Sequence, residues 1–133
     1  KIMTEIVVIT HGNLAAELVK VVSDITERPA AAIPVCLEFH RDQAEYSRNI
    51  TDVFNRLNPE EQVIVLTDLF GGTPSNITFP FVREGKLEVI TGLNLPMLMY
   101  LVMNAEEKSF KELCEGAYKA GKDAIIIAGQ FMS

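Results

Sequence analysis

Hydrophobic and polar positions follow two alternating patterns along the chain. Short, nearly continuous apolar runs are typical of strands buried on both faces of a parallel sheet. They occur at residues 5–10, 35–39, 62–67, 87–91 and 123–128. Between these runs, apolar residues recur every three or four positions, which is the spacing of amphipathic helices. Strands and helices therefore alternate, which predicts an α/β fold with helices on both faces of a mainly parallel, doubly wound sheet.

The expected helix boundaries follow from residues that favour the ends of helices. Asn13 and Asp42 are predicted to cap the first two helices, and the second of these runs to about Leu57. Gly121 is predicted to be the C′ residue that ends the last helix. The helices after the second are expected around Pro74 and over residues 95–103 and 110–120.

Length and composition narrow the class of protein. At 133 residues the chain is predicted to form one domain over residues 1–133. Its formal net charge is −6 and no stripe of Lys and Arg is present, which disfavours a nucleic-acid partner. No apolar run reaches membrane-spanning length and no signal-peptide pattern occurs, so we expect a soluble, cytoplasmic protein. Cys36 and Cys114 lie outside any paired motif, which predicts free, buried thiols in a reducing compartment.

Two chemically active side chains directly follow predicted strands. His11 follows the run at residues 5–10, and Asp68 follows the run at residues 62–67. In a sheet of order 2-1-3-4, the first and third strands are neighbours, and ligands bind outside their carboxyl ends. We therefore expect His11 and Asp68 to meet there. The carboxylate would orient one imidazole nitrogen and leave the other free as a nucleophile.

The loop after Asp68 has features of an anion-binding site. Gly71 and Gly72 allow backbone N–H groups to approach an anion, Thr73 adds a hydroxyl, and a helix start adds a favourable dipole. Each feature has an ordinary alternative, because a lone histidine often simply ends a strand and "GGTP" is commonly a turn. Together they describe the nucleophile, orienting group and anion cradle that phosphoryl transfer through histidine requires.

Apolar residues are expected to surround this site. Leu69 and Phe70 follow the aspartate, and Pro96 and Met97 begin the apolar run "LPMLMYLVM". We predict that these four residues form a rim on which a protein partner docks. The rest of the run is interpreted as a core helix.

The second histidine, His40, lies next to Arg41 and Asp42 and is interpreted as a solvated surface residue, because no carboxylate or glycine-rich loop is expected to point at it. A metal site that combines both histidines with Cys36 lacks a recognisable ligand spacing. The sequence therefore predicts no metal and no other cofactor.

Three motifs give the chain a resemblance to a known family. "THG" at residues 10–12, "DLFGGTPSN" at 68–76 and "GLNLPML" at 92–98 resemble the IIA domain of the mannose class of the bacterial phosphoenolpyruvate-dependent sugar phosphotransferase system (PTS). The resemblance covers essentially the whole chain. Many relatives carry Ser where this chain has Thr73, and many continue through an Ala/Pro-rich linker into a IIB domain. This chain stops at Ser133, so we expect either a freestanding IIA protein or an excised domain.

The resemblance implies a specific function and assembly. His11 would be phosphorylated on Nε2 by the phosphocarrier protein HPr and would pass the group to a IIB component, with only indirect contact to the membrane through the transporter. Asp68 would bond the other ring nitrogen, and Gly71, Gly72 and Thr73 would hold the phosphoryl oxygens. The family fold has the order 2-1-3-4 and a last antiparallel strand exchanged within a homodimer, for which residues 123–128 are the candidate.

Other functions share parts of this pattern. A regulatory module that senses its phosphorylation state, or a phosphotransfer subunit of a dihydroxyacetone kinase, would use the same histidine chemistry. A flavodoxin-type binding domain is disfavoured because "HGN" is not a phosphate-binding run for flavin mononucleotide. A response-regulator receiver is disfavoured because His11 occupies the place of its acidic cluster.

Overall fold

A four-stranded parallel sheet lies at the centre of the fold. A computed structural model of the chain describes residues 3–69 and 73–132. Within them the strand order is β2-β1-β3-β4, and every adjacent pair runs parallel, so the predicted order 2-1-3-4 is confirmed. The strands are β1 (Thr4–His11), β2 (Ile33–Leu37), β3 (Gln62–Thr67) and β4 (Leu87–Thr91).

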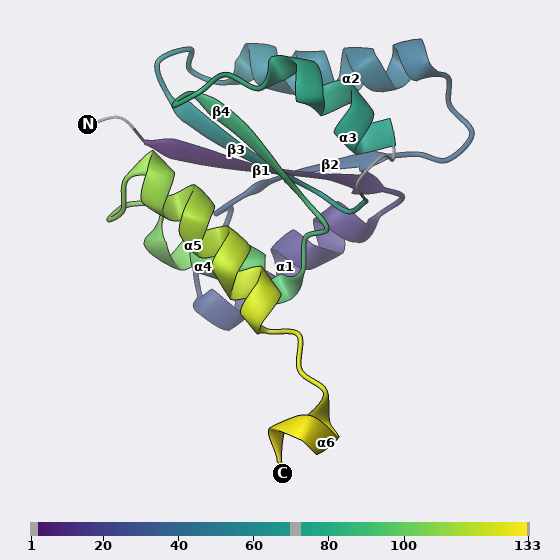
Figure 1. The fold of residues 1–133 in the computed structure, drawn as a ribbon. Helices are drawn as coiled ribbons and strands as arrows, with labels where there is room; N and C mark the ends of the chain where they lie inside the picture. Colours follow the sequence, from purple (N-terminus) through teal and green to yellow (C-terminus); the bar gives the residue numbers. More distant parts are fainter. Residues whose placement is uncertain (1–2, 70–72, 133) are drawn as a thin grey trace.

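Helices cover both faces of this sheet (Figure 1). One face carries α1 (Leu14–Thr26), α4 (Leu95–Asn104) and α5 (Phe110–Asp123). The other face carries α2 (Gln43–Arg56) and α3 (Thr73–Thr78), followed by the short 3₁₀ helix η1 (Phe79–Phe81). The doubly wound α/β class predicted from the alternating pattern is therefore confirmed. None of the helices in the described ranges is long and apolar enough to cross a membrane.

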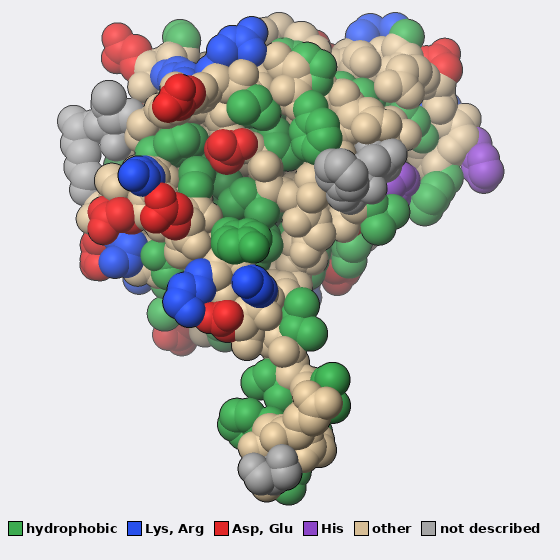
Figure 2. All heavy atoms as spheres, in the orientation of Figure 1, with side chains coloured by type: hydrophobic (Ala, Val, Ile, Leu, Met, Phe, Trp, Pro, Cys, Tyr) green, Lys and Arg blue, Asp and Glu red, His purple; other side chains and the backbone are tan. Residues whose placement is uncertain are grey.

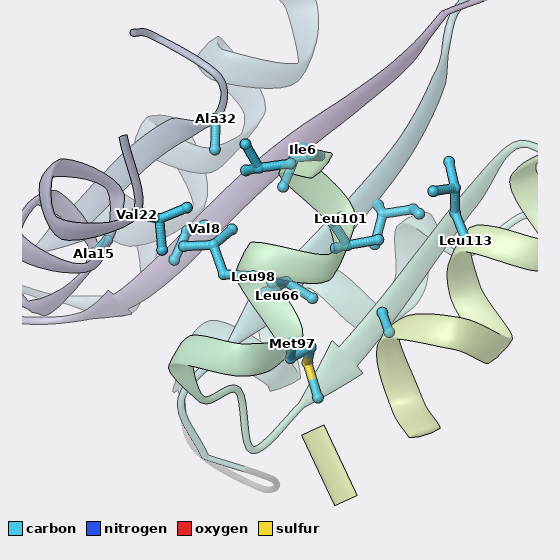
Figure 3. Packing of buried hydrophobic residues seen from close by; sticks show 13 residues of the cluster. Ile6, Val8, Ala15, Val22, Ala32, Leu66, Met97, Leu98, Leu101 and Leu113 are labelled. Carbon is cyan, nitrogen blue, oxygen red and sulfur yellow. The ribbon is translucent and has the colours of Figure 1, made fainter. Parts of the chain in front are cut away.

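Successive residues of the central strands pack into two hydrophobic clusters, one on each side of the sheet. The cluster against α1, α4 and α5 contains Ile6, Val8, Ile64 and Leu66 (Figure 3). The cluster on the side of α2 and α3 contains Val7, Ile9, Val63 and Val65. Alternate strand residues point to opposite faces, and here both faces are buried. This explains why β1 and β3 are continuous apolar runs rather than alternating ones.

Asn13 and Asp42 precede the first two helices as predicted, but only Asp42 caps its helix with a side-chain hydrogen bond. Asp42 caps α2 through its side chain, which accepts a hydrogen bond from the Glu45 N–H at 2.8 Å. Asn13 precedes α1 but makes no capping bond with its side chain. The buried hydroxyl of Thr10 instead accepts from the Ala15 N–H at 2.8 Å. Thus the end of β1 itself supplies a hydrogen-bond partner for the first turn of α1.

Gly121 does not end the last long helix, because α5 continues through it to Asp123. A Cβ at position 121 would lie 2.8 Å from Cε of Met97 and 3.2 Å from Oδ1 of Asn94. This glycine therefore allows α5 to pack closely on the start of α4. The sequence suggested a helix stop where the structure uses glycine for its small size.

The predicted strand over residues 123–128 is wrong for the single chain. Asp123 is still in α5, residues 125–127 have no regular structure, and α6 (Ala128–Phe131) follows. The direction in which α5 ends carries this segment away from the sheet (Figure 1), so its backbone pairs with none of the described strands. Three isoleucines, Ile125, Ile126 and Ile127, are left 57–77% exposed. Exchange of this segment between two chains stays a prediction.

A pair of carboxyl groups at the amino-terminal end of the sheet makes stability depend on pH. Partial burial, together with a hydrogen bond and repulsion from Glu61, raises the pKa of Glu5 above its ordinary value of 4.5. The folded chain then holds a proton at pH values where the unfolded chain has lost it. Stability contributed by this group is therefore lost as the pH rises from about 4.5 through the raised pKa.

We expect Glu5→Gln to leave the free energy of unfolding unchanged near pH 4 and to raise it slightly at pH 7. The gain should stay below about 1 kcal/mol, because water screens a partly exposed pair. Urea unfolding at both pH values measures the difference. Glu60→Gln, at an exposed neighbour of Glu61, is the control. A loss of stability at pH 7 in Glu5→Gln alone would contradict the expected sign.

Candidate functional site

His11 and Asp68 meet at the carboxyl edge of the sheet, as predicted. Nδ1 of the imidazole lies 2.8 Å from Oδ2 of Asp68. The same oxygen accepts the backbone N–H of His11 at 3.0 Å. The pairing of β1 with β3 places Ile9 opposite Thr67. His11 and Asp68, which follow these two residues closely, therefore lie side by side at the end of the sheet. Parallel strand register therefore builds this contact between residues 57 positions apart.

The geometry assigns a distinct role to each imidazole nitrogen. An ionised carboxylate only accepts hydrogen bonds, so Nδ1 carries the proton in the pair with Asp68. Nε2 of a neutral ring then carries the lone pair, and no described residue bonds to it. The side chain of His11 is 30% exposed and that of Asp68 is 13% exposed. The imidazole is thus partly exposed while the carboxylate that orients it is largely buried, which is an arrangement compatible with a nucleophilic histidine.

Buried hydroxyl groups hold the backbone around the aspartate. Ser75 of α3 is fully buried, and its Oγ lies 2.7 Å from Oγ1 of Thr67. Its hydroxyl also donates to the carbonyl of Leu69, so it contacts the chain on both sides of Asp68. Oδ1 of the aspartate accepts the Leu69 N–H at 2.9 Å. The sequence analysis did not assign a role to Ser75, although a serine within the "DLFGGTPSN" motif was a usable signal.

The loop "GLNLP", residues 92–96, lies against the same edge of the sheet. The Leu93 N–H donates to the carbonyl of Thr67 at 3.0 Å. Asn94 then caps α4 by accepting from the Met97 N–H at 3.1 Å, and it donates to the carbonyl of Gly121 at 2.9 Å. Hydrogen bonds from this loop thus connect the end of β3 with both α4 and α5.

Two of the three residues predicted to bind the phosphoryl group, Gly71 and Gly72, lie outside the described residues. Thr73 is described as the half-buried first residue of α3. It lies five residues after Asp68 in the sequence. Contact of these three residues with a phosphoryl group stays a prediction.

The predicted docking rim is only partly compatible with the structure. Leu69 and Pro96 are exposed, and Phe70 lies outside the described residues. Met97 is only 5% exposed and belongs to the core cluster against α1, α4 and α5, so its place in an exposed rim is wrong. The cause is helical periodicity, because position 97 shares the buried face of α4 with Leu98 and Leu101.

An aromatic residue that the sequence analysis did not single out lies beside the histidine. The rings of Phe39 and His11 stack with centroids 6.1 Å apart and an interplanar angle of 21°. Phe39 is 62% exposed although it is large and apolar. It follows β2 as His11 ends β1, so the position of both at one sheet edge was the available signal. The histidine side chains (purple) lie at one side of the face in Figure 2, with hydrophobic side chains (green) beside them.

The second histidine and the two cysteines make no hydrogen bond or ring contact with the pair of His11 and Asp68 among the described residues. His40 is exposed, as predicted, and its ring neighbours that of Phe39 at 6.4 Å between centroids. Cys36 and Cys114 are free thiols, both half-buried rather than fully buried. Burial raises the pKa of Cys114 to about 11, so this thiol stays protonated at neutral pH.

Sequence comparison with known proteins identifies the family that the three motifs resemble. The sequence model of the family described as "PTS system fructose IIA component" matches residues 5–118. A fructose-specific EIIA component from Bacillus subtilis (strain 168) is 34% identical over 73 residues, which are 53% of this chain and 47% of that protein. The match therefore spans about half the length of that relative. A sorbose-specific EIIA component from Lacticaseibacillus casei is 27% identical over 113 residues, covering 82% of this chain and 79% of that protein.

A solved structure gives the same fold. The PTS IIA protein associated with the fucose utilization operon of Streptococcus pneumoniae superimposes with a TM-score of 0.86. The superposition covers 100% of this chain and 98% of that chain, at 22% sequence identity. At this identity the likeness supports the fold alone.

Proposed function

We propose a phosphoryl-carrier function for this chain, which belongs to the family of PTS fructose IIA components. As a member of that family it is a component of a sugar phosphotransferase system. In our proposal it accepts a phosphoryl group from phospho-HPr on His11, in the cytoplasm, and passes the group to a IIB component. The observation that carries this proposal is the 2.8 Å contact between Nδ1 of His11 and Oδ2 of Asp68.

The transfer step follows from the roles of the two nitrogens. The lone pair of Nε2 attacks phosphorus, the Nε2–P bond forms, and the bond from phosphorus to the donor breaks with its electron pair returning to the donor. Positive charge develops on the imidazole as the bond forms, and the carboxylate of Asp68 stabilises it through Nδ1–H. In the second transfer a nucleophile of the IIB component attacks phosphorus, and the electron pair of the N–P bond returns to Nε2.

The loop and the exposed residues near the histidine complete the proposal. Phosphoryl transfer passes through a loose transition state, which needs hydrogen-bond donors toward the three equatorial oxygens. We assign this task to Gly71, Gly72 and the hydroxyl of Thr73. Docking of the partner proteins is assigned to Leu69, Phe70 and Pro96. Met97 is left out because it is buried.

A reconstituted relay tests the function. The protein is mixed with phosphoenolpyruvate, Enzyme I and HPr, and its intact mass is measured. We expect a gain of one phosphoryl group that is labile to acid and stable to base, and that disappears when a IIB component is added. No gain while HPr itself is phosphorylated would overturn the carrier function. A phosphohistidine that persists with every IIB component tested would instead favour the regulatory alternative.

We also propose that two chains form a homodimer by exchanging the segment at residues 123–128. The strand β4 lies at the edge of the sheet, and all five of its residues are half-buried. A groove of about 410 Å³ runs along it, between β4 and α5, with Ile90, Cys114 and Tyr118 in its lining. The exposed isoleucines at 125–127 have the apolar, β-branched character that such an edge favours.

Charged substitutions in this segment are expected to prevent dimerisation. Ile125 and Ile127 would share one face of a strand, so Ile125→Glu combined with Ile127→Glu places two unpaired carboxylates in the interface. Each unpaired buried charge costs roughly 3 kcal/mol or more. Light scattering coupled to size-exclusion chromatography should give a dimer for the wild type and a monomer for this variant. Met132→Glu, exposed but beyond the segment, should remain dimeric. A dimeric double variant would refute the exchange.

A further inference from the structure

We propose that Phe39 is a positioning residue for His11, an inference that rests on the proposed phosphoryl-carrier function. Its ring, as the stacked neighbour of the imidazole, fixes the plane of that ring. The direction in which Nε2 points to an incoming phosphorus atom then depends on Phe39 as well as on Asp68.

One hydrogen bond leaves the imidazole with freedom to turn. The terminal torsion of a histidine side chain is soft and broad. The contact from Nδ1 to Asp68 fixes one edge of the ring but permits tilting about that edge. The Phe39 ring lies at 21° to the imidazole plane with centroids 6.1 Å apart, and it restricts this tilt from one face. Together the hydrogen bond to Asp68 and the stacking on Phe39 define a single direction for Nε2.

Gly12 permits the close approach of Phe39 to the chain beside His11. Its φ of +57° lies in the left-handed region, and its N–H donates to the carbonyl of Leu37 at 2.8 Å. A Cβ at this position would lie 3.1 Å from Cε2 of Phe39. The residue after His11 is therefore kept small on the side where the phenylalanine ring lies.

The loop that carries Phe39 is closed on itself, so the backbone that bears this exposed ring is fixed. The hydroxyl of Tyr46 donates to the carbonyl of Glu38 and accepts the Arg41 N–H at 3.2 Å. The guanidinium of Arg41 also pairs with the carboxylate of Glu38 at 2.7 Å. These contacts bridge the residues on both sides of Phe39.

Phosphorylation by a small donor separates positioning from docking. Phosphoramidate donates directly: the Nε2–P bond forms, the P–N bond of the donor breaks, and ammonia leaves. Without a protein partner, any effect of Phe39 on the rate must act through His11. An aromatic stack of ordinary strength predicts that Phe39→Leu is phosphorylated about threefold to tenfold more slowly. Phe39→Tyr, which keeps a flat ring, should react at the wild-type rate.

Ile25→Ala is the matched control, because it removes exposed apolar surface at the far end of α1. It should react at the wild-type rate. Equal rates for Phe39→Leu and the wild type would overturn the positioning role. A defect seen with phospho-HPr but not with phosphoramidate would also overturn it and would make Phe39 a docking residue instead.

The nuclear magnetic resonance spectrum of the unphosphorylated protein gives a second readout that does not depend on the carrier function. The ring protons of His11 should shift in Phe39→Leu, which loses the ring current of its neighbour, and should keep their positions in Ile25→Ala. If even the wild type accepts no phosphoryl group, the carrier function fails, and these resonances still test whether Phe39 stacks on His11, the contact on which the positioning role depends. Unchanged His11 resonances in Phe39→Leu would then refute it.

Discussion

Replacing His11 with alanine is expected to abolish phosphorylation while leaving the fold intact. Alanine has no nucleophilic atom, so phospho-HPr or phosphoramidate should add no phosphoryl group to the variant. The backbone N–H at position 11 would still reach Oδ2 of Asp68, as it does now at 3.0 Å. Since the imidazole is 30% exposed, its loss should cost only about 1 kcal/mol of stability. Intact mass spectrometry and urea unfolding measure the two effects.

His40→Ala is the matched control for that experiment, because the two histidines are the only ones in the chain. His40 is exposed and pairs with no carboxylate among the described residues, so its replacement should leave phosphorylation unchanged. If His11→Ala still gained a phosphoryl group and His40→Ala did not, the phosphorylated residue would have been assigned to the wrong histidine.

Removal of the Asp68 carboxylate is expected to slow phosphoryl transfer without stopping it. A hydrogen bond to a charged group contributes about 1.5–3 kcal/mol, which corresponds to a rate about tenfold to 150-fold lower if the full contribution is lost in the transition state. Asp68→Ala loses both the orientation of Nδ1 and the stabilisation of the developing positive charge. Rapid-quench kinetics under single-turnover conditions give the rate of the transfer itself.

Asp68→Asn separates the two contributions of the carboxylate. Its amide oxygen can still accept a hydrogen bond, but its negative charge is gone. We expect a rate between those of the wild type and Asp68→Ala. Unchanged kinetics in both variants would show that the 2.8 Å contact has no role in transfer. Comparison of unfolding curves excludes a general loss of structure as the cause.

The parts of the fold that could be predicted from sequence are those that depend on repeated patterns. Buried parallel strands appear as apolar runs, and alternating helices and strands imply parallel pairing. Once the order 2-1-3-4 was assumed, the ends of the first and third strands had to be neighbours. The contact between His11 and Asp68 follows from that topology, without any knowledge of side-chain geometry.

The predictions that were wrong concern residues with more than one possible use. Gly121 has the flexibility of a helix stop, but in α5 it makes room for Met97 and Asn94. Met97 was placed in the rim because it begins a helix near the site, whereas periodicity turns it to the core. The apolar run at 123–128 has the composition of a strand, but strand formation also needs an available edge. Only the packing of distant elements decides such cases.

The position of Phe39 was also beyond the sequence analysis. A phenylalanine at the end of an apolar run is normally assigned to the core, yet here it is 62% exposed. Its stacking on His11 depends on a loop closed by Tyr46, seven residues further along the chain. Local propensity cannot specify a contact that depends on the closure of a loop and on the neighbouring strand together.

The 57-residue separation between His11 and Asp68 has a consequence for synthesis of the protein. During translation the histidine is made long before the aspartate, and an unfinished chain holds an imidazole with no orienting carboxylate. Under the proposed carrier function, such a chain would be a poor acceptor, although it already carries the residue proposed to react. The phosphoryl donor would then distinguish completed, folded molecules from unfinished ones.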